Sequence, residues 1–294
     1  MAVKELMHVL PPASTHWVGD GFPVRTLVSI ERDAAQSSPF LMLDYAGPHR
    51  FAPGDTPRGV GAHPHRGFET VTIVYQGEVA HRDTAGNSGV IGPGDVQWMT
   101  AGAGVLHEEF HSRSFTETGG VLEMAQLWVN LPARDKLCAP AYQAIFSAQI
   151  PAIALDDGAG EVRVIAGHHA DARGPARTRT PMNVWDVKLI ADRSAAFDFP
   201  DGWTALLVML RGAVMVGGKP VDAAQTAHFS GPGATIAVHA QADSQLLLLS
   251  GAPLNEPIAH YGPFVMNTRQ ELLEAVDAFK RGRLLPESQP FAID

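Results

Sequence analysis

The chain of 294 residues contains one cysteine, few aromatic residues and no long apolar run. The lone Cys138 allows neither an internal disulfide nor a thiolate metal cluster, which predicts a reducing, cytoplasmic compartment. No stretch of about 18 uninterrupted apolar residues occurs, so no membrane-spanning helix is expected. The N-terminal segment also lacks the features of a secretory signal. The formal net charge of −9 disfavours direct binding to nucleic acid or to an acidic membrane surface.

What the sequence does contain is typical of β-rich proteins. Short runs rich in Val, Ile, Leu and Thr alternate with turns that contain Gly, Pro, Asp or Asn, as in TVTIVYQGEVAHR and TALLVMLRGAVMVGG. Regularly spaced short strands favour a sandwich or barrel over a fold of alternating strands and helices. The order strand, Gly turn, strand, Gly-Pro-Gly turn, strand occurs once in each half of the chain. This weak repeat predicts two similar barrels in tandem.

The strand pattern is lost between Pro132 and Pro151, and we place the boundary between the barrels there. The predicted domains are residues 1–135 and residues 136–294. One helix is predicted over residues 268–281, because Thr268 and Glu271 have the spacing of a capping box. We assign this helix to the C-terminal domain.

Two pairs of polar residues have the spacing of metal ligands. His63 and His65 are two residues apart, so on an extended segment both imidazoles leave the same face, and Glu69 has the same parity. His107 and Glu109 repeat this spacing. Two such pairs on neighbouring strands would enclose a single ion. Three imidazoles and one carboxylate suit a divalent transition metal, and do not suit calcium or magnesium.

The segments around these pairs resemble the pirin family. HPHRGFETVT, GEVAHRDTAGNSGVIGPGDVQWMTAGAGVLHEEF and QLWVNLP are similar to the N-terminal signature of the pirins, and NEPIAHYGPFVMNTRQELLEA is similar to the C-terminal one. The resemblance implies an all-β fold of two tandem cupin (jelly-roll-like) β-barrels packed together, with a short C-terminal α-helix. It also implies one mononuclear metal in the N-terminal barrel, with Fe(II) expected and Mn, Ni, Cu, Co or Zn as alternatives.

Carried over position by position, the metal ligands of the pirins fall on His63, His65, His107 and Glu109. Cupins in general often take their carboxylate from the first motif, four residues after its second histidine, and this position is Glu69. Glu69 therefore remains the alternative to Glu109 as the fourth ligand.

The second barrel departs from this pattern. When residues are counted back from Gly212 as from Gly77, the positions of His63 and His65 become Asp198 and Pro200. We therefore expect a C-terminal domain without a metal site.

Other polar residues are candidates for the surroundings of the metal. Gln126, Trp128 and Asn130 share one face of a predicted strand and could line a pocket beside it. The amide of Gln126 can hold a bound water or a substrate oxygen. We therefore expect Gln126 to line the pocket beside the metal. Glu69 is a second candidate for this role if it is not a metal ligand.

The resemblance implies two functions. The first is a non-haem iron dioxygenase of the quercetin 2,3-dioxygenase type, which cleaves a flavonol or related enolic aromatic substrate with dioxygen and releases carbon monoxide. Glu109 would then be the catalytic residue, taking the proton of the substrate hydroxyl as a general base. The alternative is an iron-dependent, redox-sensitive regulatory protein that acts through a protein partner.

Overall fold

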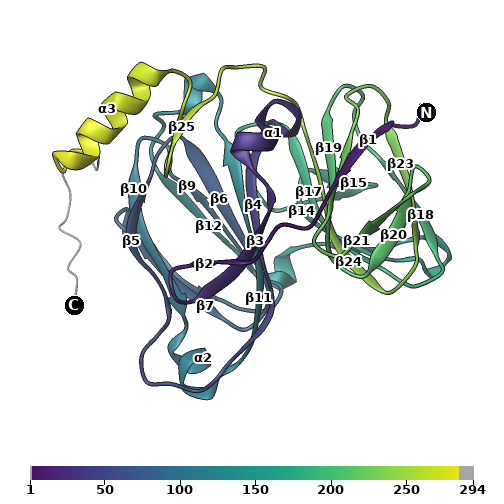
Figure 1. Cartoon of the computed structure of the whole chain (residues 1–294), viewed down its shortest axis with the longest axis horizontal. Helices are drawn as coiled ribbons and strands as arrows, with labels where there is room; N and C mark the ends of the chain where they lie inside the picture. Colours follow the sequence, from purple (N-terminus) through teal and green to yellow (C-terminus); the bar gives the residue numbers. More distant parts are fainter. Residues whose placement is uncertain (1, 285–294) are drawn as a thin grey trace. The chain divides into compact units, whose positions relative to one another are not determined.

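A computed structural model describes residues 2–284 of the chain. The chain is built mainly from strands (Figure 1) and forms two compact units, each assembled from segments that are not consecutive. The first barrel unit contains residues 15–24, residues 46–147 and residues 255–284. The second barrel unit contains residues 2–14, residues 25–45 and residues 148–254.

The barrel strands of the first unit form two sheets, and β25 and β26 form a separate two-stranded sheet. A four-stranded sheet has the order β5-β10-β7-β8, and the other sheet begins β12-β9-β6-β11 and continues through β4, β3 and β2. The chain passes between the two units within β3 and β4. The strands and helices of this unit are β2 (His16–Val18), β3 (Phe22–Val28), β4 (Phe40–Phe51), β5 (Gly59–His65), β6 (Phe68–Gln76), β7 (Val79–Asp83), β8 (Ser88–Ile91), β9 (Val96–Thr100), β10 (Val105–His111), α2 (Arg113–Thr118), β11 (Gly120–Asn130), η1 (Ala133–Asp135), β12 (Ala141–Ile145), β25 (Ala259–Tyr261), β26 (Phe264–Met266) and α3 (Arg269–Lys280).

The second barrel unit repeats this architecture with a seven-stranded sheet, β1-β22-β19-β24-β17-β14-β13, and a four-stranded sheet, β18-β23-β20-β21. Its interior is filled by apolar side chains that include Trp185, Phe197 and Leu207. Its elements are β1 (Leu6–Leu10), α1 (Ile30–Ser37), β13 (Ala152–Ala154), η3 (Asp156–Gly158), β14 (Gly160–Ala166), β15 (His168–His169), β16 (Ala172–Arg173), β17 (Met182–Leu189), β18 (Ser194–Asp198), β19 (Thr204–Arg211), β20 (Ala213–Val216), β21 (Lys219–Asp222), β22 (Thr226–Phe229), β23 (Thr235–Ala240) and β24 (Ser244–Gly251), with η2 (Ser147–Gln149) at the junction of the units.

Strand β6 shows how the sequence builds the first barrel. Its FETVTIVYQ segment is rich in β-branched residues, whose stiff side chains pack well on a pleated surface. Val74 belongs to the apolar core inside the barrel, with Phe22, Phe51 and Met124. Because side chains alternate along a strand, the residues of β6 with the parity of Val74 face the interior and the others face the opposite side of the sheet.

The C-terminal helix forms as its sequence predicts, but packs elsewhere than expected. Thr268 and Glu271 make both hydrogen bonds of a capping box, and α3 begins at Arg269, directly after Thr268. We assigned this helix to the C-terminal domain, yet it lies with β25 and β26 in the first barrel unit. The apolar face that contains Leu272 is buried there, against Phe264 and Met266 of β26. The boundary between residues 135 and 136 remains our proposal for the limits of the two domains in the sequence.

None of the helices within residues 2–284 is both long and apolar enough to cross a membrane.

Candidate metal centre

Two neighbouring strands of the four-stranded sheet bring three histidines together. Strands β5 and β10 are antiparallel, and His63 lies directly opposite His107, while His65 lies opposite Val105. Because alternate residues share a face, all three imidazoles lie on the same face of this sheet. Their candidate ligand atoms lie within 4.8 Å of one another. Histidines far apart in the sequence thus form one compact group, as the two-residue spacing predicts.

Glycines allow the chain to pass closely around this group. Gly67 follows β5 with a φ of +85°, and a Cβ there would lie 2.0 Å from the carbonyl oxygen of Val265. Gly102 precedes β10 with a φ of +49°, and a Cβ there would lie 2.2 Å from the carbonyl oxygen of Cys138. The amide of Gly67 donates a hydrogen bond of 2.9 Å to the carbonyl of Gly102. The turn at Gly67, after β5, and the turn at Gly102, before β10, are therefore joined by a backbone hydrogen bond.

The chemistry of the three imidazoles fits a metal ion. Burial lowers the pKa of His65 and of His107 well below the usual value, and the neighbouring imidazoles lower each further. Both rings are therefore neutral at neutral pH, which is the form that binds metals. Neither ring nitrogen of the fully buried His107 has a hydrogen-bond partner among the described residues. His63 is half-buried, and its Nδ1 donates to the carbonyl of Gly61 at 2.9 Å, which leaves Nε2 available.

Glu109 lies beside the histidines and is held by a glutamine. The Nε2 of Gln126 donates to both carboxylate oxygens of Glu109, at 3.1 and 2.8 Å, and Thr72 Oγ1 lies at 3.4 Å from one of them. Burial raises the pKa of Glu109, while the Gln126 hydrogen bond and the nearby His63 lower it. The group of atoms within 4.8 Å of one another contains the three histidines and no carboxylate. Glu109 of β10 thus lies next to the three histidines, and Gln126 of β11 holds its carboxylate in place.

Glu69 faces away from the histidines. Thr72 contacts Glu109 inside the barrel, and Glu69, three residues earlier on the same strand, has the opposite parity. Its carboxylate accepts a hydrogen bond of 2.6 Å from Thr100 Oγ1. The expected parity with His65 fails because the left-handed turn at Gly67 separates the two strands, which belong to different sheets.

Strand alternation also holds at Glu108, which lies between His107 and Glu109 on β10. Its side chain pairs with Arg82 of the neighbouring strand β7, on the face opposite to the histidines.

Aromatic side chains border the histidine group. The ring of Trp128 lies 5.4 Å from that of His65, and the ring of Phe68 lies 5.0 Å from it. Trp128 thus faces the histidines as its shared parity with Gln126 predicts. Asn130, the third residue of this predicted face, instead accepts a hydrogen bond from the buried Lys136.

His81 also lies on the face that carries the three histidines and has no counterpart in our sequence analysis. His81 of β7 is directly opposite Glu109 of β10, and Tyr142 makes a hydrogen bond of 2.5 Å to its Nε2. The two rings are stacked, with centroids 4.9 Å apart. Burial lowers the pKa of His81 to about 4 and raises that of Tyr142. The sequence offered one signal for His81, its two-residue spacing from Asp83, but its partner Tyr142 belongs to β12, a strand far away in the sequence.

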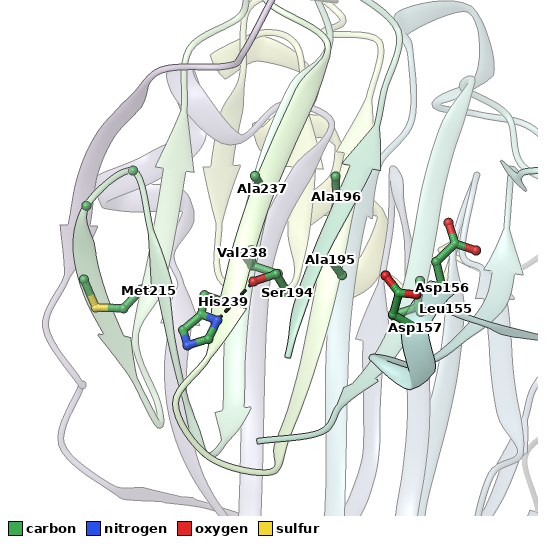
Figure 2. A pocket seen from close by; sticks show the side chains of 12 residues that line it. Leu155, Asp156, Asp157, Ser194, Ala195, Ala196, Met215, Ala237, Val238 and His239 are labelled. Atoms are coloured by element: carbon green, nitrogen blue, oxygen red, sulfur yellow. Dashed lines mark hydrogen bonds between the residues drawn. The ribbon is translucent and has the colours of Figure 1, made fainter. Parts of the chain in front are cut away.

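The second barrel unit has a groove of a different character. A cavity of about 560 Å³ lies over strands β18, β20 and β23 (Figure 2). Ser194 and His239 form a hydrogen bond of 3.0 Å at this groove, and both side chains are exposed. Small side chains such as Ala196 and Ala237 form much of the remaining lining. Asp198, which we aligned with His63, is exposed and accepts a hydrogen bond from Thr235.

Comparison with known proteins assigns the family. The family described as "Pirin" matches residues 21–129, and the family described as "Pirin C-terminal cupin domain" matches residues 184–285. This chain belongs to the pirin family. Its two barrels are cupin domains, and the predicted all-β bicupin fold with a short C-terminal helix is confirmed.

Individual relatives extend over nearly the whole chain. A Pseudomonas aeruginosa protein named "Putative quercetin 2,3-dioxygenase" is 54% identical, over 96% of this chain and 99% of its own length. A pirin-like protein of Caulobacter vibrioides is 40% identical, over 96% of this chain and all of its own length. The crystal structure of quercetin 2,3-dioxygenase from Acinetobacter baumannii is 52% identical and has a TM-score of 0.94, over 96% of this chain and 99% of that one.

Proposed function

We propose that the first barrel unit binds one divalent transition metal through His63, His65 and His107, with Glu109 as the fourth ligand. The observation that supports this most strongly is the fully buried His107, whose two ring nitrogens lack partners among the described residues. A buried polar atom without a partner costs about 1–3 kcal/mol, and a metal ion at the histidine group would remove that cost at one nitrogen. Nitrogen donors with one carboxylate favour ferrous iron, with Mn, Ni, Cu, Co and Zn as alternatives.

We further propose that the protein is a dioxygenase of the quercetin 2,3-dioxygenase type, acting on a flavonol or a related enolic aromatic compound. The names of the relatives in Pseudomonas and Acinetobacter support this reaction. When bound, the metal supplies Lewis acidity that makes the enolic hydroxyl of the substrate more acidic. In this proposal Glu109 accepts the proton of that hydroxyl on a carboxylate oxygen.

The surrounding side chains suit this role. Glu109 is 4% exposed, so its carboxylate is shielded from bulk water. Gln126 orients both carboxylate oxygens through its Nε2. The partly exposed Trp128 presents aromatic surface beside His65, which suits a planar aromatic substrate, and the fully buried Phe68 keeps water from that side.

The test is anaerobic reconstitution with ferrous iron, followed by elemental analysis and by oxygen uptake with quercetin. We expect one iron per chain, and oxygen uptake with carbon monoxide release only when quercetin is present. His107→Ala should lose both. His239→Ala, which removes an exposed histidine of the second barrel unit, should keep both.

Two results would contradict the proposal. Full iron content in His107→Ala would disprove the ligand assignment. Stoichiometric iron without oxygen uptake across several enolic and catecholic compounds would disprove the reaction. It would direct attention to the regulatory alternative, in which a protein partner distinguishes the oxidation states of iron.

A further inference from the structure

Lys136 is a buried lysine whose ammonium group joins three separate segments of the first barrel unit. It is 2% exposed. Its Nζ donates to the carbonyl oxygens of Gly67 at 2.7 Å and Val265 at 2.8 Å, and to Oδ1 of Asn130 at 2.5 Å. An ammonium group has three N–H donors, and here each has its own acceptor. The side chain is thus fully used as a hydrogen-bond donor.

Two of these acceptors lie close to the proposed metal ligands. Gly67 is two residues after His65, at the turn that leads from β5 into β6. Asn130 ends strand β11, two residues after Trp128, whose ring contacts His65. Lys136 therefore ties the turn after the ligand strand to the strand that borders the ligand.

The third acceptor belongs to the C-terminal segment. Val265 of β26 also donates its amide to the carbonyl of Arg66 at 3.0 Å, and the amide of Arg66 donates to the carbonyl of Pro263 at 3.3 Å. Strand β26 is itself packed under α3 through Phe264 and Met266. The turn between β5 and β6 is thereby fastened to a strand that the helix supports.

We propose that Lys136 is a positioning residue for the metal centre, which fixes the direction of the His65 imidazole by locking the turn at Gly67 against Asn130 and Val265. This inference rests on the proposed metal binding. A metal ligand must be held to within about 0.5 Å of its productive position, and backbone hydrogen bonds next to a ligand supply that restraint. An apolar side chain at residue 136 would leave three buried acceptors without donors and release the turn.

The uncharged nature of the three acceptors supports a role in orientation. Burial lowers the pKa of Lys136 to about 7, while the more distant Glu256 and Glu271 raise it. A lysine kept for charge alone would have a carboxylate as hydrogen-bond partner, whereas here two backbone carbonyls and one amide accept all three bonds.

The test uses cobalt(II) as the probe, because its visible absorption reports the geometry of the ligands. Metal-free wild-type protein, Lys136→Met and Leu207→Ala are titrated with cobalt(II), and their thermal stabilities are measured in parallel. Leu207→Ala is the control, since it removes buried apolar volume from the core of the second barrel unit, which contains neither the Gly67 turn nor β26. We expect Lys136→Met to bind cobalt(II) at least tenfold more weakly and with a changed absorption spectrum. Leu207→Ala should lose stability but keep the wild-type affinity and spectrum.

The outcomes separate this inference from the proposed function. If the wild-type protein binds no cobalt(II), the proposed metal centre is wrong and the inference falls with it. If the wild-type protein binds cobalt(II) and Lys136→Met has the same affinity and spectrum, only the inference is overturned. Should Lys136→Met fail to fold, Lys136→Gln, which keeps a two-hydrogen donor, is measured against the same two criteria.

Discussion

Replacement of Gln126 by Leu should weaken metal binding by one to two orders of magnitude. The Nε2 of Gln126 is the closest donor to Glu109, at 3.1 and 2.8 Å from its two oxygens, and the remaining contact from Thr72 is long at 3.4 Å. Because one nitrogen makes both contacts, we count a single hydrogen bond to a charged group, worth about 1.5–3 kcal/mol. Each 1.4 kcal/mol corresponds to about a factor of ten in affinity, so we expect a loss of about 10–100-fold.

The assay is a competition titration of ferrous iron or cobalt(II) against a chelator, with Gln76→Leu as the matched control. Gln76 of β6 also donates from Nε2 to a glutamate, Glu123 of β11, at 2.8 Å, but outside the histidine group. Gln76→Leu should leave metal affinity within about twofold of wild type. Equal affinities in Gln126→Leu and Gln76→Leu would refute the argument that Gln126 orients a metal-binding carboxylate.

Three further predictions concern the neighbouring carboxylates and histidine. In a cobalt(II) titration, Glu69→Gln should leave the affinity unchanged and Glu109→Gln should lower it. The opposite result would identify Glu69 as the fourth ligand. In metal-free protein, Glu109→Gln should be more stable than wild type at pH 7, because the raised pKa of Glu109 makes its charged form a cost that grows as pH rises above about 4.5. Urea unfolding should show this advantage disappear in acid, and a constant difference would count against a buried, charged Glu109. As pH falls from 6.5 to 4, the free energy of unfolding of the wild-type protein should decrease by up to about 3 kcal/mol relative to that of His81→Phe. The reason is that His81 binds a proton in the unfolded chain but stays neutral in the folded protein over this range. If the free energies of unfolding of the two proteins changed equally with pH across this range, His81 would bind a proton as readily in the folded state as in the unfolded chain, and the prediction would be wrong.

The sequence predicts those parts of the site that depend on strand alternation. His63, His65 and His107 were identified by two-residue spacing, and the register of β5 against β10 brings them together. The same rule applied to β11 made Gln126 a pocket candidate, but its hydrogen bond to Glu109 was not predicted.

Features that depend on packing between distant segments could not be predicted in this way. The parity argument failed at Glu69 because Gly67 turns the chain from one sheet into the other. His81 meets Tyr142, and Lys136 meets Val265, only after strands far apart in the sequence have assembled. The capping box of α3 is local and was predicted, whereas its place in the first barrel unit was not, because a helix sequence does not specify which surface covers its apolar face.

One metal ion held by the three histidines of the first barrel unit is the basis of the proposed function. The most direct measurement is anomalous diffraction at the iron edge from crystals of the protein reconstituted with ferrous iron. We expect one anomalous peak per chain, about 2.0–2.2 Å from a ring nitrogen of each of His63, His65 and His107, with a carboxylate oxygen of Glu109 at a similar distance. A peak at any other position, or no peak in crystals of protein that contains stoichiometric iron in solution, would contradict it.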